Sequence, residues 1–423
     1  MQRVAELVRN GELEQALVRM WVLAGQNNGN ALNQWINSRG IPHLFEQTCK
    51  NLSCDIQSET GLTTHRIITA PLACVVALDG IVRSTYRSQP SVKIRTYQEE
   101  GAEYWLTPKL LAVPQTISMR RQSSNREAWF QHMVIIPKRT SQGIGVNLKD
   151  SGWGIWLRSK EILRQPTPRL GIWISHFQDT AKLELVFSPE GNFRAQGVES
   201  ADVRLNSILD TLNRAAHERA VVLLMPELTV SLEARDHMKK WLDENRDHSL
   251  QLIVAGSFHE CVGEVSSGNS NWFNTAEIWT ARGEPLAIHK KLRPFGEATG
   301  GSENIHVGNE VTVLSSPFGL MTLLICKDFL DYHQSVQTLL QEVPVDWVLV
   351  PSYGDETTVR AHQRVAHMLA TVGPGINIAV ANQRNIEISP GNPCPGFSHP
   401  VGEMTPITCP NEGFLAWFPF SHS

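Results

Sequence analysis

Apolar runs of strand length alternate with helix-like segments along the C-terminal part of the chain, from Arg169 onward. Helices are predicted over about 201–216 and 233–245, because their apolar residues recur at helical spacing. The strands before, between and after them are the apolar runs RLGIWISHF, AVVLLMPE, LQLIVAGSF, VDWVLVPS and INIAVANQ. This alternation predicts a layered α/β or α+β structure, in which helices lie outside a sheet.

Two pairs of apolar runs are separated by short turns, and each pair is predicted to form a β-hairpin. The first pair, NTAEIWTARGEPLAIHKK, turns near Arg282 and Gly283. The second pair, VTVLSSPFGLMTLLIC, turns around residues 317–319 and ends at Cys326. Together with the helices, these hairpins complete the pattern of a layered sheet.

The pattern before residue 165 is less regular. It starts with an amphipathic helix over about 1–20 and continues with strand-like runs such as 73–82 and 133–137, between turn-rich stretches. The change near 165–168 predicts two domains: residues 1–165, a smaller mixed α/β domain of unidentified fold, and residues 169–423. A chain of 423 residues is long enough to give each domain its own core.

Charge is distributed unevenly between the two predicted domains. Residues 1–165 contain 20 Lys and Arg against 13 Asp and Glu, whereas residues 166–423 contain 18 against 29. A mildly basic N-terminal domain could be regulatory or bind a protein or nucleic-acid partner, although a solvated surface explains the charge more simply. No basic run interleaved with aromatic residues stands out.

The remaining composition indicates an ordinary globular protein. No apolar stretch reaches the roughly 18 residues of a membrane helix, and the N-terminus lacks a secretory signal, so a cytoplasmic protein without a membrane partner is expected. The seven cysteines are scattered and form no CxxC pair. This spacing argues against a disulfide framework and a zinc site, so no metal is expected, and it leaves room for a reactive thiol.

Chemically reactive residues stand where several predicted strands end. Cys326 ends the run GLMTLLIC, Glu227 ends AVVLLMPE, and Lys291 ends the second strand of the first hairpin. Taken singly, each has an ordinary interpretation: a core cysteine, a capping or surface glutamate, and a solvated lysine. Taken together, a thiol, a carboxylate base and a cation that can stabilise an oxyanion are what nucleophilic catalysis by cysteine needs.

The order of these motifs resembles that of the nitrilase, or carbon–nitrogen hydrolase, superfamily. The resemblance runs from about residue 169 to the C-terminus and rests on the segments VVLLMPEL, LIVAGSF, NTAEIWTARGEPLAIHKK, VGNEVTVLSSPFGLMTLLICKDF, DWVLVPSYG and INIAVANQ. It implies a four-layer αββα sandwich, a homodimer or higher oligomer, and a reaction on a small-molecule amide or nitrile that needs no cofactor.

The resemblance also implies a role for each candidate residue. Glu227 would be the general base, Cys326 the nucleophile, Lys291 the oxyanion-stabilising cation and Glu297 a supporting glutamate, with the backbone N–H of Lys327 completing the oxyanion site. Further residues of the same motifs that could line a substrate pocket are Phe295, Asp328, Ser352 and Tyr353.

The identity of the catalytic lysine is open between two neighbours. Lys291 is preferred to Lys290 because it lies eight residues beyond Gly283 of the hairpin turn, as the lysine of the family does. An alternative spacing, measured from the PFGE segment as in apolipoprotein N-acyltransferases, falls on His289.

Three functions are compatible with the sequence. The first is an amidase-type hydrolase of a non-peptide amide or nitrile that works through a thioester. The second is an N-acyltransferase with the same triad, at which the PFGE segment hints. The third is a non-catalytic interaction module of nitrilase fold, which could belong to a bacterial defence system. The presence of Glu227, Lys291 and Cys326 argues against it.

Motifs of competing chemistries are missing from the sequence. It has no GxSxG elbow, no P-loop, no GxGxxG after a strand and no HExxH. His362 and His367 fall on a predicted helix and are interpreted as packing or surface residues.

Overall fold

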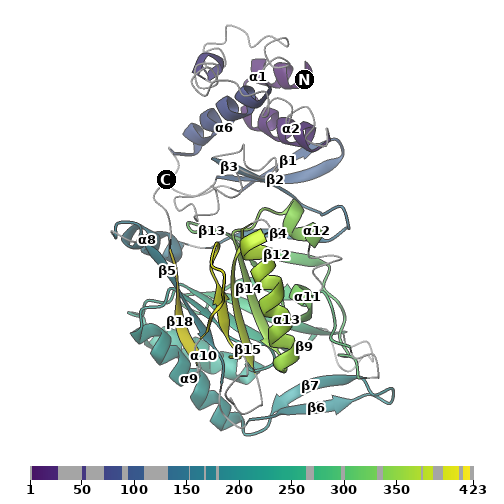
Figure 1. The fold of residues 1–423 in the computed structure, drawn as a ribbon, viewed down its shortest axis with the longest axis vertical. Coiled ribbons are helices and arrows are strands. Elements are labelled where there is room, and N and C mark those ends of the chain that lie inside the picture. Colours follow the sequence, from purple (N-terminus) through teal and green to yellow (C-terminus); the bar gives the residue numbers. More distant parts are fainter. Residues whose placement is uncertain are drawn as a thin grey trace. The chain divides into compact units, whose positions relative to one another are not determined.

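The computed structural model describes residues 2–26, 50–53, 71–87, 94–108, 132–151, 153–165, 168–177, 181–262, 271–296, 301–330, 337–372, 375–383, 394–408 and 413–419. The chain divides into two compact units (Figure 1). One comprises Met1–Leu111, Ile117–Arg139 and Glu342–Pro344, and the other Ala112–Thr116, Thr140–Gln341 and Val345–Ser423.

The N-terminal unit packs helices against a small sheet. Its helices are α1 (Gln2–Arg9), α2 (Leu13–Gln26) and α6 (Pro71–Arg87), and its antiparallel sheet has the order β1 (Arg95–Glu99), β2 (Ala102–Pro108) and β3 (Met133–Pro137). Their shared core includes Leu7, Leu17, Trp21, Leu78 and Ile135. The unit is therefore of the mixed α/β type expected, and the strand expected over 133–137 is confirmed.

The strand-like interpretation of residues 73–82 is wrong, because this segment is the centre of α6. Its buried apolar residues are Cys74, Val75, Ala77, Leu78, Ile81 and Val82, which share one face of a helix. A short apolar run is compatible with either element, so the periodicity alone could not decide. Asp79, also in α6, is fully buried and accepts hydrogen bonds from the backbone of His132 and Met133 at 2.7 and 2.9 Å.

The C-terminal unit begins earlier than the expected boundary at 165–169. Strand β4 (Gly145–Asp150) pairs in parallel with β12 (Glu310–Ser316). Helix α8 (Trp153–Ile162) adds Ile155 and Ile162 to the main core of this unit. The structure therefore places the change of unit next to Arg139, since the segment after it completes the edge of a sheet.

Two sheets form the centre of the C-terminal unit. The six-stranded sheet has the order β11 (Pro285–Lys290), β10 (Asn271–Thr280), β9 (Leu252–Val262), β8 (Val222–Leu224), β5 (Arg169–Ser175) and β18 (Gly413–Pro419). The seven-stranded sheet has the order β17 (Ile407–Thr408), β16 (Phe397–His399), β15 (Asn377–Gln383), β14 (Trp347–Tyr353), β13 (Gly319–Leu323), β12 and β4. Both predicted hairpins are confirmed, as β10–β11 and β12–β13.

The sheets pack face to face, and helices cover their outer faces (Figure 1). The core between them joins residues such as Ile172, Leu224 and Val254 of one sheet to Leu323 and Leu349 of the other. Helices α9 (Ala201–His217) and α10 (Leu232–Glu244) pack on the six-stranded sheet through a second core. Helices α11 (Lys327–Leu330), α12 (Gln337–Glu342) and α13 (Glu356–His367) accompany the seven-stranded sheet. This is the four-layer αββα sandwich that was expected.

A separate two-stranded hairpin, which the sequence pattern did not predict, lies between β5 and α9 in the chain. It consists of β6 (Leu183–Phe187) and β7 (Phe193–Val198). Ala195 and Val198 of this hairpin pack in a small apolar cluster with Leu228, which follows β8, and Phe258, which lies in β9. The hairpin is thus anchored beside the ends of two central strands.

No helix in the described parts of the chain is long and apolar enough to cross a membrane.

Candidate active site

Three reactive side chains from different strands meet at one edge of the two sheets. Glu227 follows β8, Lys291 follows β11 and Cys326 follows β13. The sheets are joined here, because the backbone N–H of Glu227 donates to the carbonyl of Ser352 in β14 at 3.2 Å. Glu227, Lys291 and Cys326 are only 2, 2 and 3% exposed. The residues expected to form the site are therefore brought together in a buried environment.

Cys326 occupies a strained turn between β13 and α11. Its φ of 45° lies in the left-handed region, which residues with a Cβ rarely adopt. The turn is held because the Cys326 N–H donates to the Pro351 carbonyl at 2.9 Å and its own carbonyl accepts from Phe329 N–H at 3.0 Å. Lys327 is the first residue of α11, so its N–H has no acceptor within the helix.

A second close turn positions Glu227. Leu228, directly after it, has a φ of 53° and donates its N–H to the Ser257 carbonyl at 2.7 Å. Gly256 in β9 has a φ of 68°, and a Cβ there would lie 2.4 Å from the Pro226 carbonyl oxygen. A glycine is required at this position, because any side chain would push away the segment that carries Glu227.

The structure distinguishes the two neighbouring lysines. The Nζ of Lys291 lies 2.7 Å from Glu227 Oε1 and 2.7 Å from Glu303 Oε2. The Nζ of Lys290 instead lies 3.9 Å from the ring centre of Phe273, outside this cluster. His289, the residue reached by the alternative spacing, is buried with Nε2 3.6 Å from Asp328 Oδ2. Of the two lysines, Lys291 is therefore the one that lies in the buried cluster with Glu227.

The second carboxylate beside Lys291 is Glu303, which no sequence motif had indicated. It accepts four N–H groups, those of His259 Nε2, Asn274 Nδ2, Lys291 Nζ and the backbone of Phe295, at 2.8, 2.7, 2.7 and 2.8 Å. Four donors occupy the lone-pair positions of both oxygens. Glu297, the residue expected in this supporting role, lies outside the described residues.

Glu227 has a different set of partners. Its Oε1 accepts from Lys291 Nζ and Asn274 Nδ2 at 2.7 and 2.8 Å, and its Oε2 accepts from the backbone N–H of Tyr353 at 3.0 Å. The thiol of Cys326 also forms a hydrogen bond with this carboxylate. Glu227 is thus the carboxylate in contact with the sulfur, and Asn274 bridges it to Glu303.

The two carboxylates have pKa values shifted in opposite directions. Burial raises the pKa of Glu227 above its ordinary value, against the opposing charge of Lys291. Burial also acts to raise the pKa of Glu303, but Lys291 and His259 outweigh it and hold that pKa at about 2. Burial alone would lower the pKa of Lys291, yet the two carboxylates raise it above its ordinary value. These shifts favour the charged forms of Lys291 and Glu303 and make Glu227 the more basic of the two carboxylates.

The thiol is protonated in this environment. Burial, and then the charge of Glu227, raise the pKa of Cys326 to about 12. Lys291, the Ser352 hydroxyl and the Tyr353 N–H act in the opposite direction, because each stabilises the thiolate. Ser352 and Tyr353, both expected near a substrate pocket, therefore lie beside the sulfur.

The other two pocket candidates differ in their surroundings. Phe295 is half-buried, and its ring centre lies 6.3 Å from that of Phe193 in β7. Asp328 is fully buried, and its carboxylate accepts backbone N–H groups of Leu292, Arg293 and Ile325 at 2.9, 2.7 and 3.1 Å. Asp328 therefore ties the segment after Lys291 to the turn at Cys326, and its oxygens are engaged within the protein.

Three residues of this site, Asn274, Glu303 and His259, were missed from the sequence. Asn274 stands in the NTA segment of the first hairpin, so its motif was visible although its role was not. Glu303 lies in a loop without periodicity, and His259 lies one residue beyond the run LQLIVAGSF in β9. His362, by contrast, agrees with its packing interpretation: it stacks on Phe329 at 5.8 Å, and burial lowers its pKa to about 4.

Replacing Glu303 by glutamine should flatten the acid limb of the stability curve. Its folded pKa of about 2 lies below the ordinary 4.5, so ionised Glu303 stabilises the fold above pH 4.5 and this stabilisation is lost as the pH falls towards 2. Urea unfolding of wild type and Glu303→Gln between about pH 5 and pH 2 measures the difference. Glu244→Gln, an exposed control, should leave the slope unchanged, and an equal slope in all three proteins would contradict the assignment.

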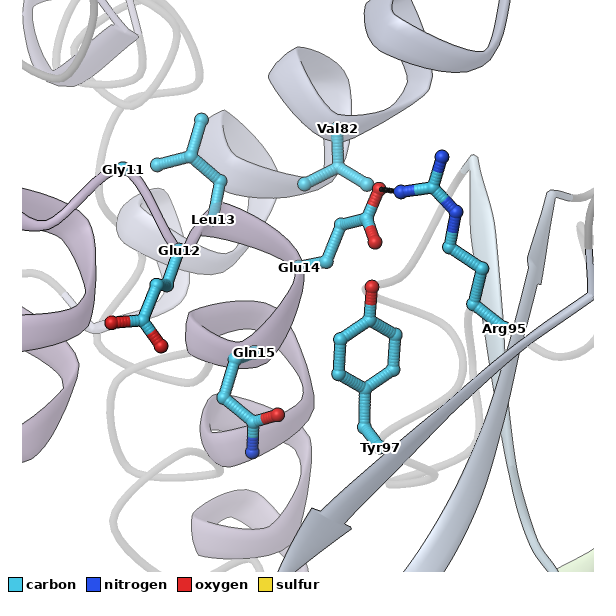
Figure 2. Close-up of a pocket in the computed structure, with 8 residues that line it drawn as sticks. All are labelled: Gly11, Glu12, Leu13, Glu14, Gln15, Val82, Arg95 and Tyr97. Carbon is cyan, nitrogen blue, oxygen red and sulfur yellow. Dashed lines mark hydrogen bonds and ion pairs between the residues drawn. The ribbon is translucent and has the colours of Figure 1, made fainter.

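Other candidate sites are few in the described residues. These residues contain no group of three His, Cys, Asp or Glu side chains placed to hold a metal ion. In the N-terminal unit, a cavity of about 430 Å³ is lined by residues of α2, α6 and β1 and by Gly11 and Glu12 before α2. Arg95 and Glu14 form an ion pair of 2.5 Å at this cavity. Figure 2 shows the carboxylate of this pair next to the Tyr97 hydroxyl.

No known family model and no curated protein matches the chain. Solved structures that are similar to it include Nit3 of Saccharomyces cerevisiae, described as a member of branch 10 of the nitrilase superfamily, with 15% identity, a TM-score of 0.42 and coverage of 59% of this chain and 90% of that one. An amidase from Nesterenkonia sp. is 21% identical, with a TM-score of 0.41 over 59% and 89% of the two chains. The NitFhit protein of C. elegans is 16% identical, with a TM-score of 0.44 over 59% and 61%. Members of the nitrilase superfamily are thus among the solved structures that are similar to this chain.

Proposed function

We propose that the C-terminal unit is an amidase-type carbon–nitrogen hydrolase in which Cys326 forms a thioester with the substrate. The observation that supports this most directly is the division of roles between two buried carboxylates around Lys291. Glu303 receives four N–H donors, whereas Glu227 hydrogen-bonds the Cys326 thiol. A scaffold would gain nothing from burying two carboxylates and a lysine beside a strained cysteine.

The first chemical step is attack by sulfur. Glu227 accepts the thiol proton as the sulfur of Cys326 bonds to the carbonyl carbon of an amide, and the carbonyl π electrons move to the oxygen. The Lys291 ammonium and the Lys327 N–H are the groups proposed to hold this oxyanion. The total charge of the buried site does not change when the proton moves from sulfur to Glu227, so the step avoids isolating an uncompensated charge.

The second step releases the amine. The oxyanion electrons reform the carbonyl, the carbon–nitrogen bond breaks, and Glu227 returns its proton to the leaving nitrogen. A water molecule then gives its proton to Glu227 and attacks the thioester carbon, which frees the acid and returns the proton to the Cys326 sulfur. Throughout, Glu303 stays ionised, because four N–H donors stabilise its carboxylate. Its negative charge keeps Lys291 protonated and in place.

The nucleophile can be tested with a haloacetamide, an electrophile that carries the amide group of the proposed substrate. Limited treatment with 2-chloroacetamide, followed by peptide mass mapping, should modify Cys326 before the other six cysteines. Glu227→Gln is expected to slow this reaction at least about tenfold, because the general base is lost while the size of the side chain is kept. Modification of Cys326 no faster than the exposed thiols of the unfolded chain would contradict the proposal.

Hydroxylamine separates the two enzymatic outcomes of the same thioester. In the presence of an amide panel, a hydrolase should release ammonia and acid, and hydroxylamine should divert part of the acyl group to a hydroxamate. Release of ammonia that occurs only when an amine acceptor is added would show an acyltransferase instead. If neither product forms and Cys326 is not modified, the non-catalytic interaction module is the remaining function.

A further inference from the structure

His259 is a fully buried histidine next to the site, and the reaction described above does not use it. It lies in β9, and its Nε2 is 2.8 Å from Glu303 Oε1, with both side chains at most 1% exposed. Its Nδ1 accepts the backbone N–H of Ala195 in β7 at 2.8 Å. Both ring nitrogens are therefore engaged, one by the hairpin and the other by the carboxylate that holds Lys291.

The contact with Ala195 fixes the tautomer of the ring. A nitrogen that accepts a hydrogen bond carries no proton, so the proton of the ring lies on Nε2 and is donated to Glu303. This donation fills a lone-pair position on Oε1, which already accepts from Asn274, and leaves Oε2 for Lys291 and the Phe295 N–H. The hairpin thus determines which ring nitrogen carries the proton that is donated to the carboxylate.

The same strand of the hairpin also holds the backbone around Glu303. The N–H of Phe193 donates to the Ser302 carbonyl at 2.9 Å, and the Phe193 carbonyl accepts from Asn304 N–H at 2.8 Å. The ring of Phe193 lies 6.5 Å from that of His259. Glu303 is consequently fixed at its main chain by Phe193 and at its carboxylate by His259, and both constraints come through β7.

We propose that His259, held by the β6–β7 hairpin, is a positioning residue that keeps the Glu303 carboxylate aligned on Lys291. It touches no reacting atom and acts through Glu303, so the inference rests on the proposed function of Cys326, Glu227 and Lys291. Without the Nε2 donor, Glu303 can rotate away from Lys291, and the cation then loses its fixed place beside the oxyanion. The expected consequence is slower reaction at Cys326 with an intact fold.

Two substitutions separate the two hydrogen bonds of the imidazole. His259→Gln places an amide N–H near the position of Nε2 and keeps the donor to Glu303, whereas His259→Asn keeps an acceptor for Ala195 but is too short to reach the carboxylate. The rate of Cys326 modification by 2-chloroacetamide should fall about tenfold or more in His259→Asn and stay within about threefold of wild type in His259→Gln. Rescue by glutamine is the result that a purely structural role would not give.

The opposite order, a slow glutamine variant and a normal asparagine variant, would show that His259 serves only to anchor the hairpin. Equal rates in wild type and both variants would also overturn the proposal. A double-mutant cycle with Glu303→Gln gives an independent test, because His259→Asn should add no further loss once Glu303 is replaced. If wild-type Cys326 is not selectively modified, the proposed function itself fails, which is a distinct result from any difference between the variants.

Discussion

Replacing Cys326 by alanine is expected to abolish amide turnover, with a loss of at least about 10⁴-fold for any substrate that the wild type cleaves. The thioester cannot form without the sulfur of Cys326, and alanine supplies no nucleophile in its place. Alanine keeps the Cβ of the strained turn, so the cost in unfolding free energy should be small, about 1 kcal/mol. Ammonia release and urea unfolding measure the two effects.

Cys261 provides the matched control. It lies in β9, half-buried and outside the carboxylate cluster, and its replacement by alanine should leave turnover within about twofold of wild type. Turnover that survives in Cys326→Ala but is lost in Cys261→Ala would move the nucleophile to another thiol. Survival in both variants would exclude cysteine catalysis altogether.

Replacing Lys291 by methionine is expected to cause the largest loss of stability. The substitution leaves Glu227 and Glu303 buried together without their shared cation, and breaking a buried ion pair in this way costs about 3–5 kcal/mol. It should also remove turnover, since the cation that stabilises the oxyanion is gone. Unfolding by urea and ammonia release at several pH values measure both effects.

The loss of stability should depend on pH in a defined direction. Without Lys291, burial and mutual repulsion raise the pKa of these two carboxyls in the folded state above the ordinary value of 4.5. The folded variant then binds a proton that the unfolded chain has released, so its deficit is smallest near pH 5 and grows as the pH rises to 8.

Lys290→Met is the control for this experiment. Its Nζ rests on the Phe273 ring, a contact worth about 1 kcal/mol or less when partly exposed. A deficit of equal size in both lysine variants, or one that does not change with pH, would contradict the ion-pair arrangement around Lys291.

Glu227, Lys291 and Cys326 could be predicted to lie together because the ends of strands can be recognised in the sequence. Glu227, Lys291 and Cys326 each end a predicted strand, and neighbouring strands of a sandwich bring their ends to a common edge. The preference for Lys291 over Lys290 followed from the position of a predicted turn, and in the structure Lys291 is the one of these two lysines that enters the buried cluster. Short-range patterns were sufficient for these residues.

Contacts between distant segments could not be predicted. Glu303 reaches Lys291 from a loop, and loops carry no periodicity that would show which side chain turns inward. His259 became recognisable only through the β6–β7 hairpin, which the pattern did not show. The early boundary of the C-terminal unit depends likewise on the pairing of β4 with β12, 160 or more residues away.

During turnover, the acyl group of the substrate is expected to be carried on Cys326. Acid quenching of the wild-type protein during turnover of an amide, followed by peptide mass mapping, tests it directly. We expect a mass increase equal to the acyl group on the peptide that contains Cys326, absent from Cys326→Ala and removed by hydroxylamine. Steady release of ammonia with Cys326 unmodified at every time point, or an acyl group on another residue, would contradict it.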